Sequence, residues 1–184
     1  MPNHFQEFNS LTIDHIQRRN KVHEICRQYS RSPSRGNFKR LKSLFKQVGK
    51  EVFIESGFHC DYGAKISLGD RVYMNINCTL LDGAAIIIGD DCLIGPNVQL
   101  LTINHALAPE ERLKKANLAS DIIIENNVWL GAGVIVVPGV TIHSGTSIGA
   151  GSVVTRDCDK NCLYAGNPAR KIKQNLIGNS CQKI

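Results

Sequence analysis

Residues 124–154 read IENNVW LGAGVI VVPGVT IHSGTS IGAGSV V, and each group of six begins with an aliphatic residue. The residues in this first position are Ile124, Leu130, Val136, Ile142, Ile148 and Val154. A second position, four residues further on, holds only small or β-branched side chains: Val128, Val134, Val140, Thr146 and Ser152. Two positions that share one period identify a repeat of six residues.

A period of six fits neither ordinary element, because a helix repeats its face every 3.6 residues and a single strand every second residue. It fits one short strand followed by a corner, and the glycines of the run permit tight corners. Such a unit cannot bury its aliphatic residue alone, so neighbouring units must stack about 4.8 Å apart through strand pairing. The sequence therefore predicts a coil of stacked strands, although the period does not determine its hand.

The same pattern extends upstream with less regularity. Two further six-residue series occur between residues 51 and 100, and they consist of Leu68, Met74 and Leu80, and of Ile88, Ile94 and Leu100. The step from Leu80 to Ile88 is eight residues, which indicates two extra residues at a corner near Asp82 and Gly83. We therefore expect the coil to cover residues 51–157.

The period is lost between residues 101 and 123 and then resumes. A long loop that leaves a regular coil is usually functional or disordered, and the clean return of the period favours function. The loop contains His105, whose side-chain type titrates near pH 6.5 and suits a general base that acts on a hydroxyl group. A loop histidine is also often merely solvated, so this role stays open from the pattern alone.

The two ends of the chain differ from the coil. In residues 1–50, apolar residues recur at spacings of three and four with arginine and lysine between them, which predicts two amphipathic helices. The segment Ser32–Gly36, with a proline and a glycine, separates these helices. A solenoid also needs a cover at its end, so residues 158–184 are expected to form a cap and a tail.

Composition limits the class of protein. The chain has 184 residues, no apolar run long enough for a membrane span and no signal peptide at its start, so we expect a soluble, cytoplasmic protein. The net charge of +6 indicates either solvated helix faces or attraction to a polyanionic ligand. Nucleic acid is not expected as that ligand, because aromatic residues make up only 6% and no nucleic-acid-binding motif occurs.

The seven cysteines form no CxxC pair, so they indicate neither a zinc site nor a disulfide framework. Cys78 and Cys92 occupy the small position of the repeat and are expected to be buried packing residues. We expect no cysteine to be catalytic.

A series of motifs along residues 58–173 resembles the maltose and galactoside acetyltransferases, which are hexapeptide-repeat acyltransferases. In order, the motifs are MNIN, LLD, NHAL, NNVWLGAG, VVPGVTI, GAGSVVT and GNPAR. HCDYG at 59–63 is especially similar to the maltose branch, and RQYSRSP at 27–33 resembles the short N-terminal module of these enzymes. The resemblance implies a mainly β protein, a left-handed parallel β-helix with three hexapeptides per turn that assembles as a homotrimer with active sites between adjacent coils.

The resemblance also implies an activity, the acetyl-CoA-dependent transfer of an acetyl group directly to a hydroxyl of a small acceptor. The implied acceptor is a sugar such as maltose, glucose or a galactoside, and no metal is required. In that family the histidine matching His105 is the catalytic base, and the asparagine matching Asn75 helps to bind and stabilise the reacting centre. Asp61 and Asp82 are candidates for hydrogen bonds to acceptor hydroxyls, although each also fits a role in forming a corner.

For the donor, the resemblance implies a track along the coil for the pantetheine arm and basic residues near the nucleotide phosphates. Small residues allow a thin ligand to lie against the backbone, and arginine offers paired donors to phosphate. The residues of this expected donor site are Trp129, Gly131, Ala132, Ala150, Thr155, Arg156, Arg170 and Lys173. A tight coil also needs glycine and alanine for packing, and Trp129 alternatively packs between subunits.

Three departures from the galactoside branch leave the acceptor open. That branch has acidic residues at the positions of Ser10 and Gly83 and a methionine at the position of Asn117. The alternatives on the same fold are therefore a xenobiotic or lipo-oligosaccharide acetyltransferase, and a coil that binds a ligand without reaction. A metal enzyme of the carbonic-anhydrase kind would need histidines that share a zinc ion between coils, whereas His59, His105 and His143 are isolated in the sequence.

Overall fold

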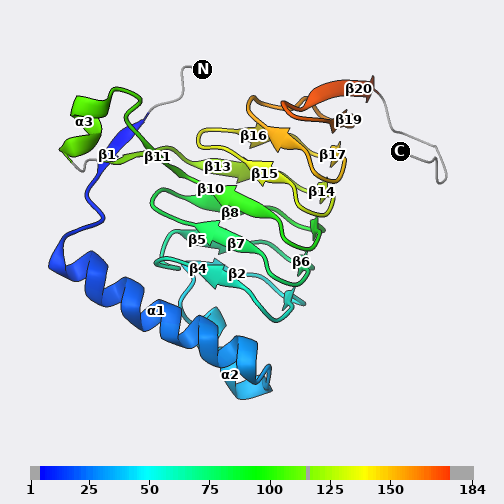
Figure 1. Ribbon diagram of the computed structural model, residues 1–184. Helices are drawn as coiled ribbons and strands as arrows, with labels where there is room; N and C mark the ends of the chain where they lie inside the picture. Colours follow the sequence, from blue (N-terminus) through cyan, green and yellow to red (C-terminus); the bar gives the residue numbers. More distant parts are fainter. Residues whose placement is uncertain (1–4, 115–116, 175–184) are drawn as a thin grey trace.

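The computed structural model describes residues 5–114 and 117–174. The chain forms a left-handed parallel β-helix of about six turns, as the repeat and the resemblance imply. Two helices lie below the first turn, and a short excursion of two strands and a helix leaves the coil on one side (Figure 1). Among the described residues, no helix combines the length and the hydropathy that a bilayer-spanning segment needs.

The coil has three faces, each a sheet of stacked strands. Face 1 contains β2 (Gln47–Val48), β5 (Ile66–Leu68), β8 (Ile86–Ile88), β13 (Ile122–Ile124) and β16 (Thr141–Ile142). Face 2 contains β3 (Phe53–Ile54), β6 (Tyr73–Met74), β9 (Leu93–Ile94), β14 (Trp129–Leu130), β17 (Ser147–Ile148), β19 (Cys162–Ala165) and β20 (Arg170–Gln174). Face 3 contains β4 (His59–Cys60), β7 (Thr79–Leu81), β10 (Gln99–Leu101), β15 (Ile135–Val136) and β18 (Val153–Val154).

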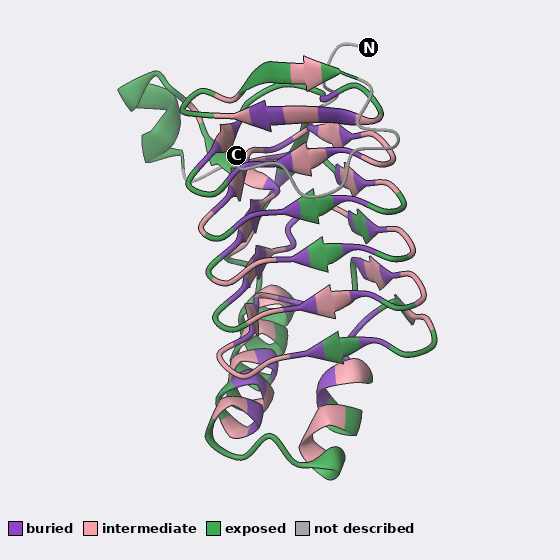
Figure 2. Ribbon diagram, turned by 90° about the vertical axis from the view of Figure 1, so that its right-hand side faces the viewer, coloured by how far each residue is buried: buried purple, intermediate pink, exposed green. Residues whose placement is uncertain are grey.

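The aliphatic position of the repeat points into the coil, where like residues stack in columns. On face 1, Leu68 pairs with Ile88, Ile88 with Ile124 and Ile124 with Ile142, and all four are at most 1% exposed. Side chains along a strand alternate between the inside and the outside of the coil. Strand β8 shows this with three isoleucines, because Ile86 and Ile88 are buried while Ile87 is 41% exposed. Figure 2 shows this change between buried and exposed residues along the strands of each turn.

The edge where face 3 leads into face 1 accepts extra residues, and we call it the loop edge. In the first turns paired residues are 20 apart, as for Gln47 and Ser67, whereas in the last turns they are 18 apart, as for Ile123 and Thr141. The expected eight-residue step between β7 and β8 is confirmed, and the same step separates β4 from β5. The excursion at 102–121 leaves at this same edge, so the pairing of the three faces continues above it.

The edge where face 2 leads into face 3 is tight and regular, and we call it the groove edge. Asn77, Asn97, Gly133 and Gly151 occupy equivalent positions there, with φ angles of 59°, 58°, 67° and 71°. These left-handed conformations are tolerated by glycine and, more than by most other residues, by asparagine. The backbone conformation at the corner, as well as burial in the core, thus restricts which residues occur in the repeat.

The two expected helices are present as α1 (Ile13–Arg31) and α2 (Arg35–Lys42). The Thr12 hydroxyl accepts the backbone N–H of His15 at the start of α1, and Val22, Cys26 and Tyr29 are buried beneath it. The coil begins with β2, slightly before the expected boundary at residue 51, because Gln47 and Val48 already pair with β5.

The N-terminal segment also contributes a strand that the sequence pattern did not reveal. Strand β1 (Gln6–Phe8) pairs with β12 (Asn117–Ala119), and β12 pairs with β11 (Ile103–His105). Helix α3 (Pro109–Leu113) lies in the chain between β11 and β12. The excursion is therefore a small three-stranded sheet that contains residues from both the N-terminal segment and the coil.

We predict that Ile88→Ala lowers the free energy of unfolding by about 2–5 kcal/mol, because it leaves a cavity in a closely packed column. The matched control is Ile87→Ala in the same strand, which should cost less than about 1 kcal/mol because Ile87 faces outward. Urea denaturation of the two variants measures the difference. Equal losses for both would contradict the assignment of the inward face.

Candidate active site

An open groove of about 390 Å³ lies along face 2 and the groove edge. Asn75, Trp129, Gly131 and Ala132, which the sequence analysis assigned to the reacting centre or the donor, all line it. The other lining residues are Tyr73, Leu93, Ile94, Gly95 and Pro96. Trp129 and Leu93 remain 43% and 52% exposed, so the groove has apolar side chains that the described chain leaves uncovered.

Strand register explains why these residues meet. Met74 pairs with Ile94, Ile94 with Leu130 and Leu130 with Ile148, so the residues that follow them form a column along the groove edge. At its glycines the column leaves no room for a side chain: a Cβ atom on Gly95 would lie 2.8 Å from the carbonyl carbon of Gly131, and one on Gly131 would lie 2.6 Å from the nitrogen of Ala150. The glycines therefore keep the groove shallow and smooth beside the exposed Ala132 and Ala150.

Asn75 is held in a defined orientation at the N-terminal end of this column. Its Oδ1 accepts the backbone N–H of Ile76 at 2.7 Å, and its Nδ2 has no hydrogen bond to any described residue. The half-buried side chain thus retains its amide donor for a ligand.

Arg170 lies at the opposite end of the same column. Ile148 pairs with Tyr164, the next residue Ala165 continues the column, and Ala165 pairs with Arg170 of β20. The Arg170 side chain is exposed, with one hydrogen bond of 2.9 Å from Nη1 to the carbonyl oxygen of Ala169. Lys173, opposite Leu163 in the same strand pair, adds a second cationic residue to this end of face 2.

His105 lies away from the groove, on strand β11 of the excursion. Its side chain is exposed, and its partner across the strand pair is the buried Asn117, which donates from Nδ2 to the Ser10 hydroxyl at 2.9 Å. Thr155 and Arg156 follow β18 and therefore also belong to the loop edge. Face 3 separates the loop edge from the groove edge, and Figure 1 shows β11 and β6 on opposite sides of the coil.

Each edge thus holds part of the expected site. The groove edge and the end of face 2 hold Asn75, Trp129, Gly131, Ala132, Ala150, Arg170 and Lys173. The loop edge holds His105, Thr155 and Arg156. A single chain does not bring the two groups together, because a sheet of the coil lies between them.

Comparisons with known proteins agree with this architecture. Residues 121–156 match the family model described as bacterial transferase hexapeptide (six repeats), and residues 85–99 match the hexapeptide repeat of succinyl-transferase. A maltose O-acetyltransferase from Clostridium difficile has a similar structure, with a TM-score of 0.88 and 34% identity over 92% of each chain. The chain belongs to the hexapeptide-repeat acetyltransferases.

Two further relatives extend the comparison for this acetyltransferase. A hexapeptide-repeat acetyltransferase from Vibrio cholerae, solved in complex with acetyl coenzyme A, has a TM-score of 0.86 and 32% identity over 91% of this chain and 92% of that chain. The galactoside O-acetyltransferase of Lactococcus lactis is 42% identical over 70% of this chain. The matched segment spans 62% of that relative's own length. As a member of this family the protein is an acyltransferase.

Asp61 and Asp82, the two candidates for binding acceptor hydroxyls in this acetyltransferase, have different surroundings. Asp82 is fully buried, and its Oδ1 accepts the backbone N–H groups of Asp61 and Tyr62 at 3.1 and 2.8 Å. Burial raises the pKa of Asp82. This geometry fits the alternative role of shaping the loop edge and gives a ligand no access to the side chain. Asp61 is half-buried, and its Oδ1 lies 3.1 Å from Nε2 of His23.

The three positions that depart from the galactoside branch lie in or beside the excursion. A Cβ atom on Gly83 would lie 2.4 Å from Cγ1 of Ile103 and 3.3 Å from Cδ1 of Phe8, so the excursion fills the space of any side chain there. Ser10 and Asn117 hydrogen bond to each other next to His105. The surroundings of the histidine therefore differ from those expected in the galactoside branch.

The expectation that His59 is isolated is wrong. The ring of His59 lies 4.4 Å from the ring of His23, measured between centroids, because α1 packs against β4. Burial, and then the neighbouring His23, lower the pKa of His59. His23 had no signal in the sequence, since 36 residues separate it from His59. His143 instead pairs with a carboxylate, with Nδ1 2.9 Å from Oε1 of Glu125.

The described cysteines are all buried. Cys26, Cys60, Cys78, Cys92, Cys158 and Cys162 are all buried free thiols, and Cys181 lies outside the described residues. Burial raises the pKa of both Cys78 and Cys92 to about 11, so neither forms much thiolate at neutral pH. Cys26 differs from these two, because a hydrogen bond with Cys60 lowers its pKa, although its side chain is buried.

We predict that native protein treated with iodoacetamide near neutral pH keeps its activity and that the six described cysteines stay unmodified. Their burial keeps the reagent away, whereas denatured protein should be alkylated at all seven cysteines. Mass spectrometry counts the modified residues, and Cys181→Ser serves as the control. Rapid inactivation of that variant would show that a described cysteine takes part.

Proposed function

We propose that the protein is an acetyl-CoA-dependent O-acetyltransferase that moves an acetyl group directly to a hydroxyl of a small acceptor. The observation that carries this proposal is the groove in which Asn75 meets Trp129, Gly131 and Ala132. The acetyl coenzyme A bound in the Vibrio cholerae relative supports the choice of donor. The six free cysteines among the described residues fit a reducing compartment such as the cytoplasm.

In this proposal the pantetheine arm lies along the column of small residues on the groove edge. Gly131, Ala132 and Ala150 leave space for a thin chain, while Trp129 and Leu93 provide an apolar wall. At the far end of the column, Arg170 and Lys173 are cationic groups for the nucleotide phosphates. Asn75 lies at the near end, beside which the thioester is placed.

The proposed reaction is a single transfer through a tetrahedral intermediate. His105 removes the proton of the acceptor hydroxyl while that oxygen attacks the carbonyl carbon of the thioester. The carbon–sulfur bond then breaks, the acetyl ester remains on the acceptor, and the coenzyme A thiolate takes the proton back from the imidazolium. No residue of the protein forms a covalent bond in this sequence.

Asn75 is proposed to stabilise the negative oxygen of the intermediate. Because its Oδ1 is engaged by the backbone N–H of Ile76, the side chain presents its Nδ2 hydrogens rather than its oxygen. Removal of a donor to such an oxyanion typically lowers kcat by about 10²–10³-fold.

We propose that the protein is a homotrimer with active sites between neighbouring chains. This arrangement follows from the division of the site, because His105, Thr155 and Arg156 lie on the loop edge and Asn75 on the groove edge. In a cyclic assembly the loop edge of each chain meets the groove edge of the next, so every site is completed by two chains. The exposed Trp129 and Leu93 would then be partly covered.

The acceptor is proposed to be a sugar such as maltose, glucose or a galactoside. A xenobiotic or a lipo-oligosaccharide is the second candidate. The filled space at Gly83 and the Ser10–Asn117 hydrogen bond support this alternative. A thiol-release assay with acetyl-CoA and a panel of these acceptors distinguishes the two classes by their kcat/KM values.

We predict that His105→Ala lowers kcat by about 10²–10⁴-fold with little change in the KM for acetyl-CoA, because a general base acts in the transition state and not in donor binding. The control is His143→Ala, which removes an imidazole of the coil that pairs with Glu125. Steady-state kinetics with the best acceptor of the panel measures both. An unchanged kcat in His105→Ala would contradict the assignment of the base.

We further predict that His105→Ala and Asn75→Ala chains complement each other when they are co-expressed in equal amounts. Random assembly into trimers gives about one quarter of the sites an intact histidine from one chain and an intact asparagine from the next. Activity should therefore return to roughly a quarter of the wild-type value, although each variant alone is inactive. No recovery in confirmed mixed trimers would place both residues in the same chain's site.

A further inference from the structure

Three potential metal ligands converge where α1 packs against the first turns of the coil. His23 lies on α1, His59 on β4 and Asp61 directly after β4. Nε2 of His23 lies 3.1 Å from Oδ1 of Asp61, and the two imidazole centroids are 4.4 Å apart. One ligand atom from each of the three residues lies within 4.8 Å of the other two.

The hydrogen bonds of this cluster are incomplete. Neither ring nitrogen of His59 has a hydrogen bond to any described residue, and Asp61 uses only Oδ1 in its side-chain contact with His23. The side chains of His23 and Asp61 are only 25% and 16% exposed. Polar groups that are removed from water to this degree usually have partners, so the cluster has free ligand capacity in a confined place.

The set of donors selects the kind of ion. Two imidazoles and a carboxylate suit zinc and related divalent transition metals, whereas calcium and magnesium prefer oxygen ligands alone. Ligand atoms about 2.1 Å from a tetrahedral zinc ion are roughly 3.4 Å from one another. The 3.1 Å contact between His23 and Asp61 is close to that separation, and the His59 nitrogen, within 4.8 Å of both, would have to move by roughly 1 Å to complete the set.

Charged groups of both signs surround the cluster. Asp82 lies behind Asp61 and accepts its backbone N–H, and the buried Oδ2 of Asp82 has no hydrogen-bond partner among the described residues. Three arginines of α1 oppose a bound cation. Arg18 and Arg19 donate to the backbone carbonyl and the hydroxyl of Tyr62, which directly follows Asp61. Arg27 lies beside His59, but its guanidinium is bound to Glu24 through contacts of 3.2 and 2.7 Å.

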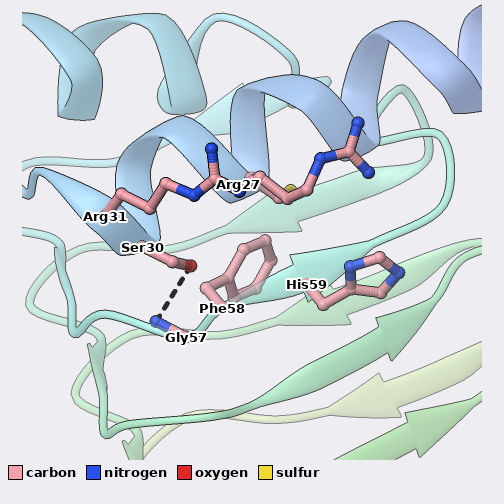
Figure 3. A pocket seen from close by; sticks show the side chains of 7 residues that line it. Arg27, Ser30, Arg31, Gly57, Phe58 and His59 are labelled. Carbon is pink, nitrogen blue, oxygen red and sulfur yellow. Dashed lines mark hydrogen bonds between the residues drawn. The ribbon is translucent and has the colours of Figure 1, made fainter.

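The cluster also has access to solvent. A pocket of about 190 Å³ lies between α1 and the start of β4, with His59 at its edge and Ser30 hydrogen bonded to the backbone N–H of Gly57 inside it (Figure 3). A site with three protein ligands keeps one position for water, and the pocket gives solvent access on the His59 side of the cluster.

We propose that His23, His59 and Asp61 form a binding site for Zn²⁺ or a similar divalent transition metal. The ion joins α1 to face 3 and so fastens the helical segment to the coil. Asp61 precedes Tyr62, whose ring packs against Phe8 of β1 at a centroid distance of 5.6 Å, and β1 belongs to the sheet that carries His105. The ion thus stabilises the base of the excursion and takes no part in acetyl transfer, and Asp61 serves as its ligand rather than as a partner of an acceptor hydroxyl.

The test uses full-length, untagged protein that has been treated with EDTA and then transferred to chelator-free buffer. Titration with Co²⁺, followed by its visible absorption, and with Zn²⁺, followed by calorimetry, should show one ion per chain. Zn²⁺ should also raise the Tm, because it binds the folded chain in preference to the unfolded chain. His59→Gln and His23→Gln should each weaken binding by at least about tenfold and abolish the Tm shift.

His143→Gln is the matched control, because His143 also contacts a carboxylate but belongs to no three-ligand cluster among the described residues. It should bind Co²⁺ as the wild type does. Circular dichroism and acetyl transfer by metal-free His59→Gln verify that this variant is folded. The proposal is overturned if wild-type protein takes up no Co²⁺, if His59→Gln binds it equally well, or if sulfur-to-cobalt charge-transfer bands show cysteine ligation instead.

Discussion

The pairing of each strand with the strand one turn above it is the constraint on which the rest of the structure depends. This register fixes every inward residue over an equivalent one, as in the column of Leu68, Ile88, Ile124 and Ile142. It also fixes every corner residue over another corner residue, which brings Asn75 into line with Gly95 and Gly131. The core and the groove are therefore two results of one spacing between strands.

The same constraint determines where the coil can vary. Extra residues within a face would break the pairing of all strands in that sheet, whereas extra residues at an edge only lengthen a corner. The loop edge contains both the two-residue insertions of the first turns and the excursion with His105. The groove edge contains no insertion among the described turns, and its column of small residues stays continuous. One edge is thus free to carry a reactive side chain and the other to hold an extended ligand.

The N-terminal segment links the edge that varies to the base of the coil. Helix α1 buries Val22, Cys26 and Tyr29, while β1 pairs with β12 of the excursion. Phe8 packs against Tyr62 and fills space beside Gly83 together with Ile103. The segment consequently shapes the surroundings of His105.

The sequence by itself determined the coil, its inward residues, the eight-residue step and the extent of the excursion, because each of these depends on local spacing along the chain. The resemblance to the maltose and galactoside acetyltransferases implied Asn75, Trp129, Gly131 and Ala132, which line one groove in the structure. Only the tertiary structure decided that His105 and Asn75 lie on different edges, that Asp82 is buried, and that His23 meets His59. These facts depend on how separate segments pack, and a repeat of six residues carries no information about contacts between a helix and a turn that lie 36 residues apart.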